Sequence, residues 1–319
     1  MRRCLYCYAP LGEESAEFHG NCSVRIFGTA LPPELPYTED QMLHLAEEVI
    51  KSQTSVTGAQ PKLSLHLEKL SKKDEPQRFT IVGLWGGYIL KPPIKQYRFL
   101  PELEDLTMHL ADISGMDVVP HSLIRLSSGQ LAYITRRIDR INATRIHMED
   151  MCQLTERLTE QKYNGSHEQI GKAISRYSVN PGLDIINFFE QVLFSFLTGN
   201  ADMHLKNFSL LDRQDLGYVL SPAYDMVASG LVVEGDEEEL ALTLNGKKKN
   251  IRKKDFVEPM NRFNIDAKAI DNLFNKLRRS VDKWHDFINI SYLPEEMKAS
   301  YHDMIRERVA RIYPHSIFI

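Results

Sequence analysis

The sequence predicts an α+β fold with two lobes, a mixed α/β lobe over residues 31–140 and a mostly helical lobe over residues 141–319. The first lobe is predicted because short β-type runs there are separated by small and polar residues. The second is predicted because longer helical segments follow, such as Asp266–Phe287 and Pro294–Ile312. With 319 residues, 43% of them hydrophobic, the chain can bury a core large enough for two lobes.

The elements of the first lobe can be placed in chain order. A helical stretch covers residues 39–51, and Leu63–Glu68 alternates leucine with polar residues, as in a strand with one buried face. Tyr88–Lys91 is a second β-type run. A helix is then expected from Pro101 to Gly115, because proline suits the first helical turn and glycine the position after the last.

In the second lobe, Ile185–Leu197 is apolar on almost every face, which predicts a deeply buried helix. Gly199 and Asn200 follow it, and these residue types tolerate the left-handed conformation that ends many helices. The polar stretch from Asp202 to Asn207 is therefore expected to begin at a fixed point on the core.

A hairpin is predicted directly after this polar stretch. Phe208–Leu211 and Tyr218–Leu220 are β-type runs on either side of a polar turn that contains Gly217. Because a hairpin reverses the chain, Asp225 is expected to return beside Asn207.

Asp202, Asn207 and Asp225 form a set that suits phosphoryl transfer. One carboxylate can accept the proton of an attacking hydroxyl, while an amide and a second carboxylate hold the Mg²⁺ that neutralises the phosphate oxygens. The Asp-x-x-x-x-Asn spacing also occurs in the catalytic loop of protein kinases. The alternative is a polar loop whose side chains only cap turns, and that would explain this motif if it stood alone. A second set of residues upstream, with the types that a nucleotide site needs, favours a phosphoryl-transfer site over a turn-capping loop.

The upstream set begins with Ser55–Lys62, a loop of small and hydroxyl-bearing residues whose backbone N–H groups can approach phosphates closely. Lys91 ends a β-type run and suits the α- and β-phosphates. Glu104, in the first turn of the next helix, is its expected partner, as a strand lysine pairs with a helix glutamate in kinases. Each of these charges taken alone could equally be a surface residue. The order of all these groups along the chain favours a nucleotide site.

Several motifs follow one another along residues 40–310: Ser55–Lys62, Ile89–Pro93, Arg137–Arg140, Glu149–Gln153, Lys162–Tyr163, Asp202–Ser209 and Pro222–Asp225. These motifs and their order resemble those of HipA-like toxins, which are bacterial serine/threonine kinases of type II toxin–antitoxin systems. The resemblance implies a two-lobed protein-kinase-like fold. Longer members carry a small subdomain before the phosphate loop, for which there is no room here. The chain therefore looks more like the short HipT-type kinases, in which that subdomain is a separate small protein.

The resemblance also implies a role for each matching position. Asp202 corresponds to the catalytic base, with Asn207 and Asp225 as metal ligands. The nucleotide-contacting positions are Thr57, Gly58, Ala59, Gln60 and Lys62 of the phosphate loop, Lys91, the adenine hinge of Arg136, Arg137 and Ile138, and His204, Lys206 and Tyr224. Family members more often have an acidic residue in place of Arg136, so only backbone contacts to adenine are carried over there.

Ser55 matches the loop serine at which these kinases phosphorylate themselves, and Thr57 is a second acceptor in the same loop. A phosphate on the loop adds about −1.5 to −2 charge at pH 7. Lys62 and Lys91 are the nearby cations that can be assigned. Autophosphorylation is therefore expected to repel the nucleotide.

The implied function is transfer of the γ-phosphoryl group of ATP, with Mg²⁺, to a protein serine or threonine. The family points to an aminoacyl-tRNA synthetase as target. It also points to a helix-turn-helix antitoxin and a HipS-like small protein as partners, with DNA contacted only through the antitoxin. A small-molecule phosphotransferase would use the same polar groups and remains an alternative. A non-catalytic ATP-binding regulator of an antitoxin complex is a second alternative, but it would need a defective acid or metal ligand.

Composition agrees with a cytoplasmic enzyme. The net charge is −4 and 26% of the residues are charged, so the chain as a whole does not attract nucleic acid. Its first residues contain no apolar run long enough for a signal peptide, and no later segment is expected to span a membrane.

Residues 1–30 are expected to form a separate N-terminal segment. Cys4-x-x-Cys7 and His19-x-x-Cys22 have the ligand types and spacings of a tetrahedral structural zinc site. The alternative is a group of reduced thiols near a flexible terminus. With Cys152 as the remaining cysteine, the chain has too few for a disulfide framework at this length.

The acidic run Glu234–Glu239 is followed by the basic run Lys247–Lys254. Asn245-Gly246 between them is a turn signal, which favours a solvated loop or hairpin. A nucleic-acid-binding patch is the alternative.

Overall fold

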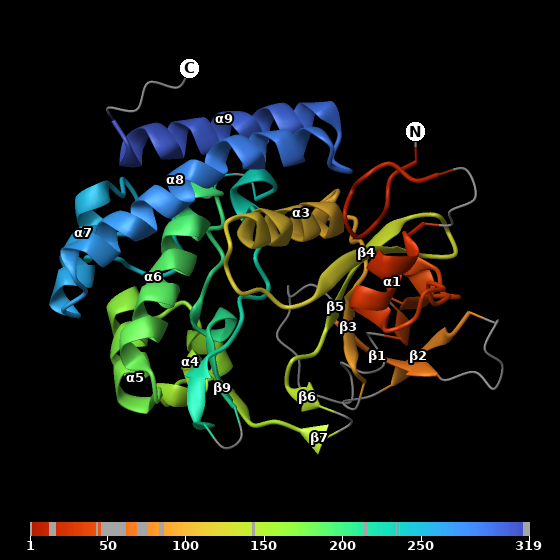
Figure 1. Ribbon diagram of the computed structural model, residues 1–319, viewed down its shortest axis with the longest axis horizontal. Coiled ribbons are helices and arrows are strands. Elements are labelled where there is room, and N and C mark those ends of the chain that lie inside the picture. The colour runs from red at the N-terminus through yellow and green to blue at the C-terminus, as the bar shows by residue number, and fades with distance from the viewer. Residues whose placement is uncertain are drawn as a thin grey trace. The chain divides into compact units, whose positions relative to one another are not determined.

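The computed structural model describes residues 2–12, 17–42, 44–45, 62–68, 76–82, 86–141, 144–213, 216–233, 235 and 237–314. The chain forms two compact units (Figure 1). The first unit contains Met1–Asp105, Val119–Thr144 and Ile290–Tyr292, and the second contains Leu106–Val118, Arg145–Asn289 and Leu293–Ile319.

The first unit is built on a five-stranded antiparallel sheet with the order β2-β1-β3-β5-β4. Its strands are β1 (Leu63–Glu68), β2 (Arg78–Val82), β3 (Tyr88–Lys91), β4 (His121–Arg125) and β5 (Leu131–Arg136). Leu63 and Leu65 of β1 are buried while His66 and Glu68 are exposed, which confirms the predicted one-sided strand. The two short strands β6 (Arg140–Ile141) and β7 (Thr144–Arg145) pair separately.

Two helices begin in the first unit. Helix α1 (Gly20–Phe27) covers the sheet through Phe27, whose ring lies 5.8 Å from that of Phe79 and 6.2 Å from that of Tyr88. Helix α3 (Leu100–Ile113) begins in the first unit and ends in the second. Gly115 follows α3 with φ +73°, as the sequence predicts. Residues 39–42 and 44–45 are helical, and the rest of the predicted helix 39–51 lies outside the described residues.

The second unit is mostly helical. Its helices are α4 (Met151–Leu154), α5 (His167–Tyr177), α6 (Pro181–Leu197), α7 (Lys253–Arg262), α8 (Ala267–Asn289) and α9 (Glu295–Ile312), with short 3₁₀ turns η1 (Thr159–Gln161), η2 (Leu205–Asn207) and η4 (Ser229–Leu231). Its three-stranded sheet has the order β10-β9-β8, from β8 (Met148–Asp150), β9 (Ser209–Asp212) and β10 (Tyr218–Leu220). In the part of the chain described, no helix is long and apolar enough to cross a membrane.

Helix α6 is surrounded by the other helices of its unit (Figure 1), which confirms the predicted buried helix. The ring of Phe194 meets Trp284 of α8 edge-on at 5.5 Å, and Phe196 meets Phe256 of α7 at 5.7 Å. Pro181 stands at the start of the helix, where its missing N–H group leaves no helical bond unmade. Its many buried aromatic side chains make α6 a fixed point for the segments at its ends.

The charged runs near residue 240 fold back on each other. Lys248 Nζ lies 2.9 Å from a carboxylate oxygen of Glu238, and Lys249 Nζ lies 3.2 Å from one of Glu237. Asn245 and Gly246 turn the chain with φ +49° and +77°. Glu237 and Glu238 are thus paired with the basic run, while Glu239 pairs with Arg308 and Arg311 of the C-terminal helix. Because these charges are neutralised within the chain, the structure favours the predicted loop or hairpin over a nucleic-acid patch.

His167 of α5 makes the stability of the second unit depend on pH. The side chain is fully buried between the rings of Phe188 and Phe208, and burial lowers its pKa from 6.5 to about 3. Between these two pH values the unfolded chain binds a proton that the folded chain does not. The free energy of unfolding should therefore fall as the pH falls below 6.5, by up to about 1.4 kcal/mol per pH unit from this residue.

The variants His167→Phe and His167→Leu should lose this contribution, because neither side chain titrates. Urea denaturation of both variants and the wild type at pH 7 and pH 5 measures it. The wild type should lose more stability over that interval than either variant. Equal losses in all three proteins would contradict the argument.

Candidate active site

The polar loop of the second unit begins where α6 ends. Gly199 adopts the left-handed conformation with φ +71°, and a Cβ atom there would collide with the Sδ atom of Met304 on α9. Asn200 N donates a hydrogen bond to Ser195 O at 2.8 Å, and Gly230 N donates to Gly199 O at 3.0 Å. The left-handed backbone favours glycine, and any larger residue would also have to displace the Met304 side chain. The loop therefore starts from a well-defined position.

Asp202 and Asn207 are joined across this loop. The Asn207 side-chain nitrogen donates to the backbone carbonyl of Asp202 at 3.0 Å, and His204 N donates to the same oxygen at 2.8 Å. The Tyr163 hydroxyl donates to Asp202 Oδ1 at 2.7 Å. Since the Asn207 amide donates through its nitrogen, its oxygen is the atom that a hard cation such as Mg²⁺ would take.

The hairpin brings the segment around Asp225 back to the loop. Strands β9 and β10 pair as predicted, and Ser221 N donates to Ser209 O at 2.9 Å. The Tyr224 hydroxyl donates to the Lys206 carbonyl at 2.9 Å and also bonds to the Ser209 hydroxyl. Asp225 follows with φ +59°, a left-handed conformation that few non-glycine residues adopt and that occurs repeatedly at active sites.

His204 is a buried histidine whose pKa is affected by the charges of two carboxylates. Burial lowers its pKa from 6.5 to about 4, although the negative charges of Asp202 and Asp225 act in the opposite direction. Its ring meets that of Tyr163 edge-on at 5.1 Å. A neutral imidazole adds no positive charge beside these carboxylates.

Two residues of the second unit hold the loop without having been assigned a role from the sequence. Asp150 accepts from Lys206 Nζ at 2.6 Å while it caps α4 through Gln153 N at 3.0 Å. Tyr163 binds Asp202, as described above. Both residues belong to motifs that the sequence contains, but only the fold shows which loop residue each one contacts.

In the first unit, Lys91 at the end of β3 forms an ion pair with Glu104 of α3, which confirms the predicted pairing. Both side chains are almost completely buried, and the Lys91 ammonium also lies 5.4 Å from the centre of the Tyr133 ring. An ion pair removed from water in this way fixes the lysine in one position.

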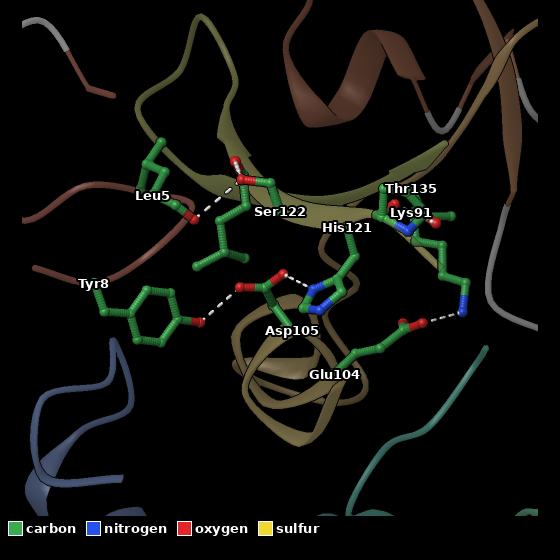
Figure 2. Close-up of polar contacts among 10 residues, drawn as sticks. Leu5, Tyr8, Lys91, Glu104, Asp105, His121, Ser122 and Thr135 are labelled. Carbon is green, nitrogen blue, oxygen red and sulfur yellow. Dashed lines mark hydrogen bonds and ion pairs between the residues drawn. The ribbon is translucent and has the colours of Figure 1, made fainter. Parts of the chain in front are cut away.

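Asp105, next to Glu104, is the centre of a second polar group. Figure 2 shows Tyr8 and His121 pointing at its carboxylate from two sides. The Tyr8 hydroxyl donates to one carboxylate oxygen at 2.7 Å, and His121 Nδ1 lies 2.7 Å from the other. This group ties the N-terminal segment and β4 to the N-terminal half of α3.

The predicted adenine hinge has its first backbone donors already in use. Arg136 N donates to Pro120 O and Arg137 N donates to Gly87 O, each at 2.9 Å. An adenine read by this segment would therefore use its carbonyl groups or the N–H group of Ile138.

Side chains close the hinge segment on itself. The Arg137 guanidinium holds the two carboxylate oxygens of Asp139 at 2.8 and 2.7 Å. Burial alone would raise the pKa of Asp139, but the hydrogen bonds and charge of Arg137 and the charge of Arg140 hold it below its ordinary value. The Arg137 guanidinium is therefore held in a bidentate ion pair with Asp139.

The phosphate loop falls largely outside the described residues, including Ser55, Thr57, Gly58, Ala59 and Gln60. Lys62 is described and is exposed just before β1. Among the predicted positions, the structure thus brings together Asp202, His204, Lys206, Asn207 and Tyr224 in the second unit, with Asp225 directly after Tyr224.

Comparison with known families identifies the chain. Residues 54–284 match the model of the HipA-like C-terminal domain. The match covers well over half of the chain, and the chain belongs to the HipA-like family.

Relatives agree with this assignment. The chain is 33% identical over 207 residues to a Sinorhizobium fredii protein named "Putative kinase Y4dM", over 61% of this chain and 49% of the relative. It is 29% identical over 215 residues to the serine/threonine-protein kinase toxin HipA of Shewanella oneidensis, over 61% of this chain and 47% of the relative. The chain thus spans about half the length of these curated relatives.

A solved structure shows the fold. A chain from the complex of Shewanella oneidensis HipA, HipB and operator DNA matches with a TM-score of 0.67 and 21% identity, over 89% of this chain and 74% of that chain. The predicted protein-kinase-like fold of mixed α and β structure is confirmed.

The buried ion pair gives a stability prediction. Lys91→Met should lower the free energy of unfolding by about 3–5 kcal/mol, because it leaves the Glu104 charge buried without its cation. The double variant Lys91→Met/Glu104→Leu should recover much of this loss, since both charges are then replaced by apolar side chains.

The matched control is Arg306→Met, which removes the exposed pair between Arg306 and Asp303 and should cost at most about 1 kcal/mol. Chemical denaturation measures all three variants. A cost for Lys91→Met no larger than that of the control would show that the pair does not hold β3 to α3.

Proposed function

We propose that this chain is an ATP- and Mg²⁺-dependent protein serine/threonine kinase and the toxin of a HipA-type toxin–antitoxin system. The observation that carries the proposal is the loop in which the Asn207 amide donates a hydrogen bond to the backbone carbonyl of Asp202. Asp225, in a left-handed backbone conformation, follows the hairpin that comes after this loop. This is the acid, amide and acid set that phosphoryl transfer uses.

Asp202 would act as the catalytic base. The Tyr163 hydroxyl occupies its Oδ1 atom, so Oδ2 is the atom that would accept the proton of the substrate hydroxyl. The Tyr163 bond also fixes the direction of the carboxylate. A base must lie within hydrogen-bond reach of the proton it takes, and a fixed carboxylate meets that need better than a mobile one.

Asn207 and Asp225 would hold Mg²⁺. An amide oxygen and a carboxylate are hard oxygen ligands that fit this ion, and the neutral His204 beside them adds no competing positive charge. When bound, the ion would neutralise the phosphate charge that builds up during transfer. Lys206, paired with Asp150, would keep the nucleotide-facing loop in place.

Lys91 would bind the α- and β-phosphates. Its ion pair with Glu104 keeps the ammonium at the end of β3, as the strand lysine of kinases is kept by a helix glutamate. The hinge would contact adenine through backbone atoms of Arg136 and Ile138.

The proposed target is a protein, in particular an aminoacyl-tRNA synthetase, phosphorylated in the cytoplasm. The proposed partners are a helix-turn-helix antitoxin and a HipS-like small protein, with DNA bound only through the antitoxin. Support comes from the family membership, from a relative named as a serine/threonine kinase toxin, and from the fold match to a HipA–HipB–DNA complex.

The chemistry is tested by separating transfer from binding. Asp202→Asn should lower phosphorylation of a protein substrate by about 10²- to 10⁴-fold, the usual contribution of a general base, while the affinity for ATP stays nearly unchanged. Asp225→Asn should instead weaken the binding of ATP in the presence of Mg²⁺ much more than in its absence. Isothermal titration and phosphate transfer from γ-labelled ATP measure the two effects.

Asp271→Asn, on the exposed face of α8, is the matched control and should behave as the wild type. Unchanged transfer by the Asp202 variant would remove Asp202 from the role of base. If Asp225 holds the ion, Mg²⁺ should raise the affinity of the wild type for ATP and should not raise that of the Asp225 variant. An Asp225 variant that keeps the wild-type effect of Mg²⁺ would remove Asp225 from its proposed role.

We also propose that the kinase limits itself by phosphorylating Ser55, with Thr57 as a second acceptor. The added charge would lie on the loop that receives the nucleotide phosphates and would lower ATP affinity. Mass spectrometry of wild-type protein incubated with ATP and Mg²⁺ should find phosphate on this loop, and Asp202→Asn should carry none. Ser55→Ala should stay active for longer, and Ser55→Asp should bind ATP more weakly. An unmodified loop in an active wild-type enzyme would end this proposal.

A further inference from the structure

Four potential metal ligands converge in the first unit, and none of them has a role in the proposed phosphoryl transfer. The Sγ atoms of Cys4, Cys7 and Cys22 and a ring nitrogen of His19 all lie within 4.8 Å of one another. All the cysteines of the chain are free thiols, so no disulfide explains the convergence of these three. Two thiols come from the first residues of the chain and the other pair of ligands from the start of α1.

The distances suit a tetrahedral zinc ion. Zinc bonds of about 2.3 Å to sulfur and about 2.0–2.1 Å to nitrogen give a sulfur–nitrogen separation of about 3.6 Å at the tetrahedral angle. His19 Nδ1 lies 3.4 Å from Cys7 Sγ and 3.8 Å from Cys22 Sγ. The two measured separations lie on either side of the expected value.

The protonation state of His19 also fits a ligand. Its Nε2 atom lies 3.1 Å from the carbonyl oxygen of Pro10, and a carbonyl can only accept a hydrogen bond. The proton of the neutral ring must therefore be on Nε2, which leaves the lone pair of Nδ1 directed at the thiols. A backbone carbonyl that fixes the second ring nitrogen in this way is a usual feature of zinc-binding histidines.

The local backbone explains how the ligands are delivered. Cys4 and Cys7 lie on a tight turn in which Tyr8 N donates to Cys4 O at 2.9 Å and Tyr8 has φ +60°. His19 is the N-cap of α1, and Ser23 N donates to His19 O at 2.9 Å. Cys22 therefore lies one helical turn after His19 and on the same side of α1.

We propose that Cys4, Cys7, His19 and Cys22 bind one zinc ion in a structural site. Because the protein supplies all four ligands, no position is left for water or substrate, and the ion has no catalytic task. Binding releases the thiol protons, since thiolates are the ligands.

The site would brace the first unit at two places. The turn of Cys4 and Cys7 carries Leu5, whose carbonyl accepts from Ser122 Oγ of β4 at 3.1 Å, and Tyr8, which binds Asp105 of α3 (Figure 2). Helix α1 carries Phe27 and Ile26, and the carbonyl of Ile26 accepts from the Tyr88 hydroxyl of β3 at 3.1 Å.

One ion would thus connect the segment that contacts α3 with the helix that contacts β3. These are the two elements that carry Glu104 and Lys91. The zinc site would therefore stabilise the part of the first unit in which the buried ion pair lies.

The test is metal analysis of the full chain, purified without chelators from cells grown with added zinc. The wild type should carry about one zinc per chain. Cys7→Ser and Cys22→Ser should lose it, whereas Cys152→Ser, which alters the cysteine outside the cluster, should keep it and is the matched control. Metal content is measured without ATP, so the result is independent of kinase activity.

His19 offers a sharper comparison. His19→Cys should keep zinc, because a fourth thiolate is also a zinc ligand, while His19→Ala should lose it. If the imidazole of His19 served only in packing or hydrogen bonding, cysteine could not replace it. Zinc removal from the wild type should lower its melting temperature, and the same treatment should leave His19→Ala unchanged.

Should the variants fail to fold, Co²⁺ can be added to zinc-stripped wild-type protein. The visible absorption bands of tetrahedral cobalt thiolate would support the site. Absence of zinc from the wild-type protein, together with absence of these bands, would overturn the proposal. So would full zinc retention by Cys7→Ser and His19→Ala.

Discussion

The buried helix α6 is the constraint on which the polar loop of the second unit depends. At its C-terminal end, Gly199 packs against Met304 in a left-handed conformation that favours glycine. At the far end of the loop, the ring of Phe208 meets Phe188 of the same helix at 5.1 Å. Both ends of the loop are thus anchored on one buried element, so Asp202 and Asn207 keep their relative position without a ligand to order them.

Polar groups in a buried setting are stabilised by partners or by staying uncharged, and the two units use these means differently. In the loop, the Asn207 amide binds a backbone carbonyl and His204 avoids the cost of burial by staying neutral. In the first unit, the charge of Lys91 is met by Glu104, while the neighbouring Asp105 is met by Tyr8 and His121. Breaking one partner of such a group costs more than the intact pair contributes.

Local patterns were sufficient to predict α6, the hairpin after the loop and the pairing of Lys91 with Glu104, because each rests on periodicity, turn residues or a known motif. The contacts of Asp105 could not be predicted, since Tyr8 is 97 positions away and nothing in the local sequence marks it as a partner. Tyr163 belongs to a motif that the sequence contains, but the local pattern does not show that its hydroxyl reaches Asp202, 39 positions away. The hinge donors satisfied by Pro120 and Gly87 likewise depend on how the strands pair, which is a property of the folded sheet.

The central claim is that this loop transfers phosphate from ATP to protein, and labelled ATP tests it most directly. Wild-type protein is incubated with γ-labelled ATP and a cell extract separated into protein and metabolite fractions, with Mg²⁺ or with a chelator. The account predicts label on serine or threonine of protein, dependent on Mg²⁺. Label confined to metabolites, or no transfer by a chain that binds ATP and Mg²⁺, would contradict it.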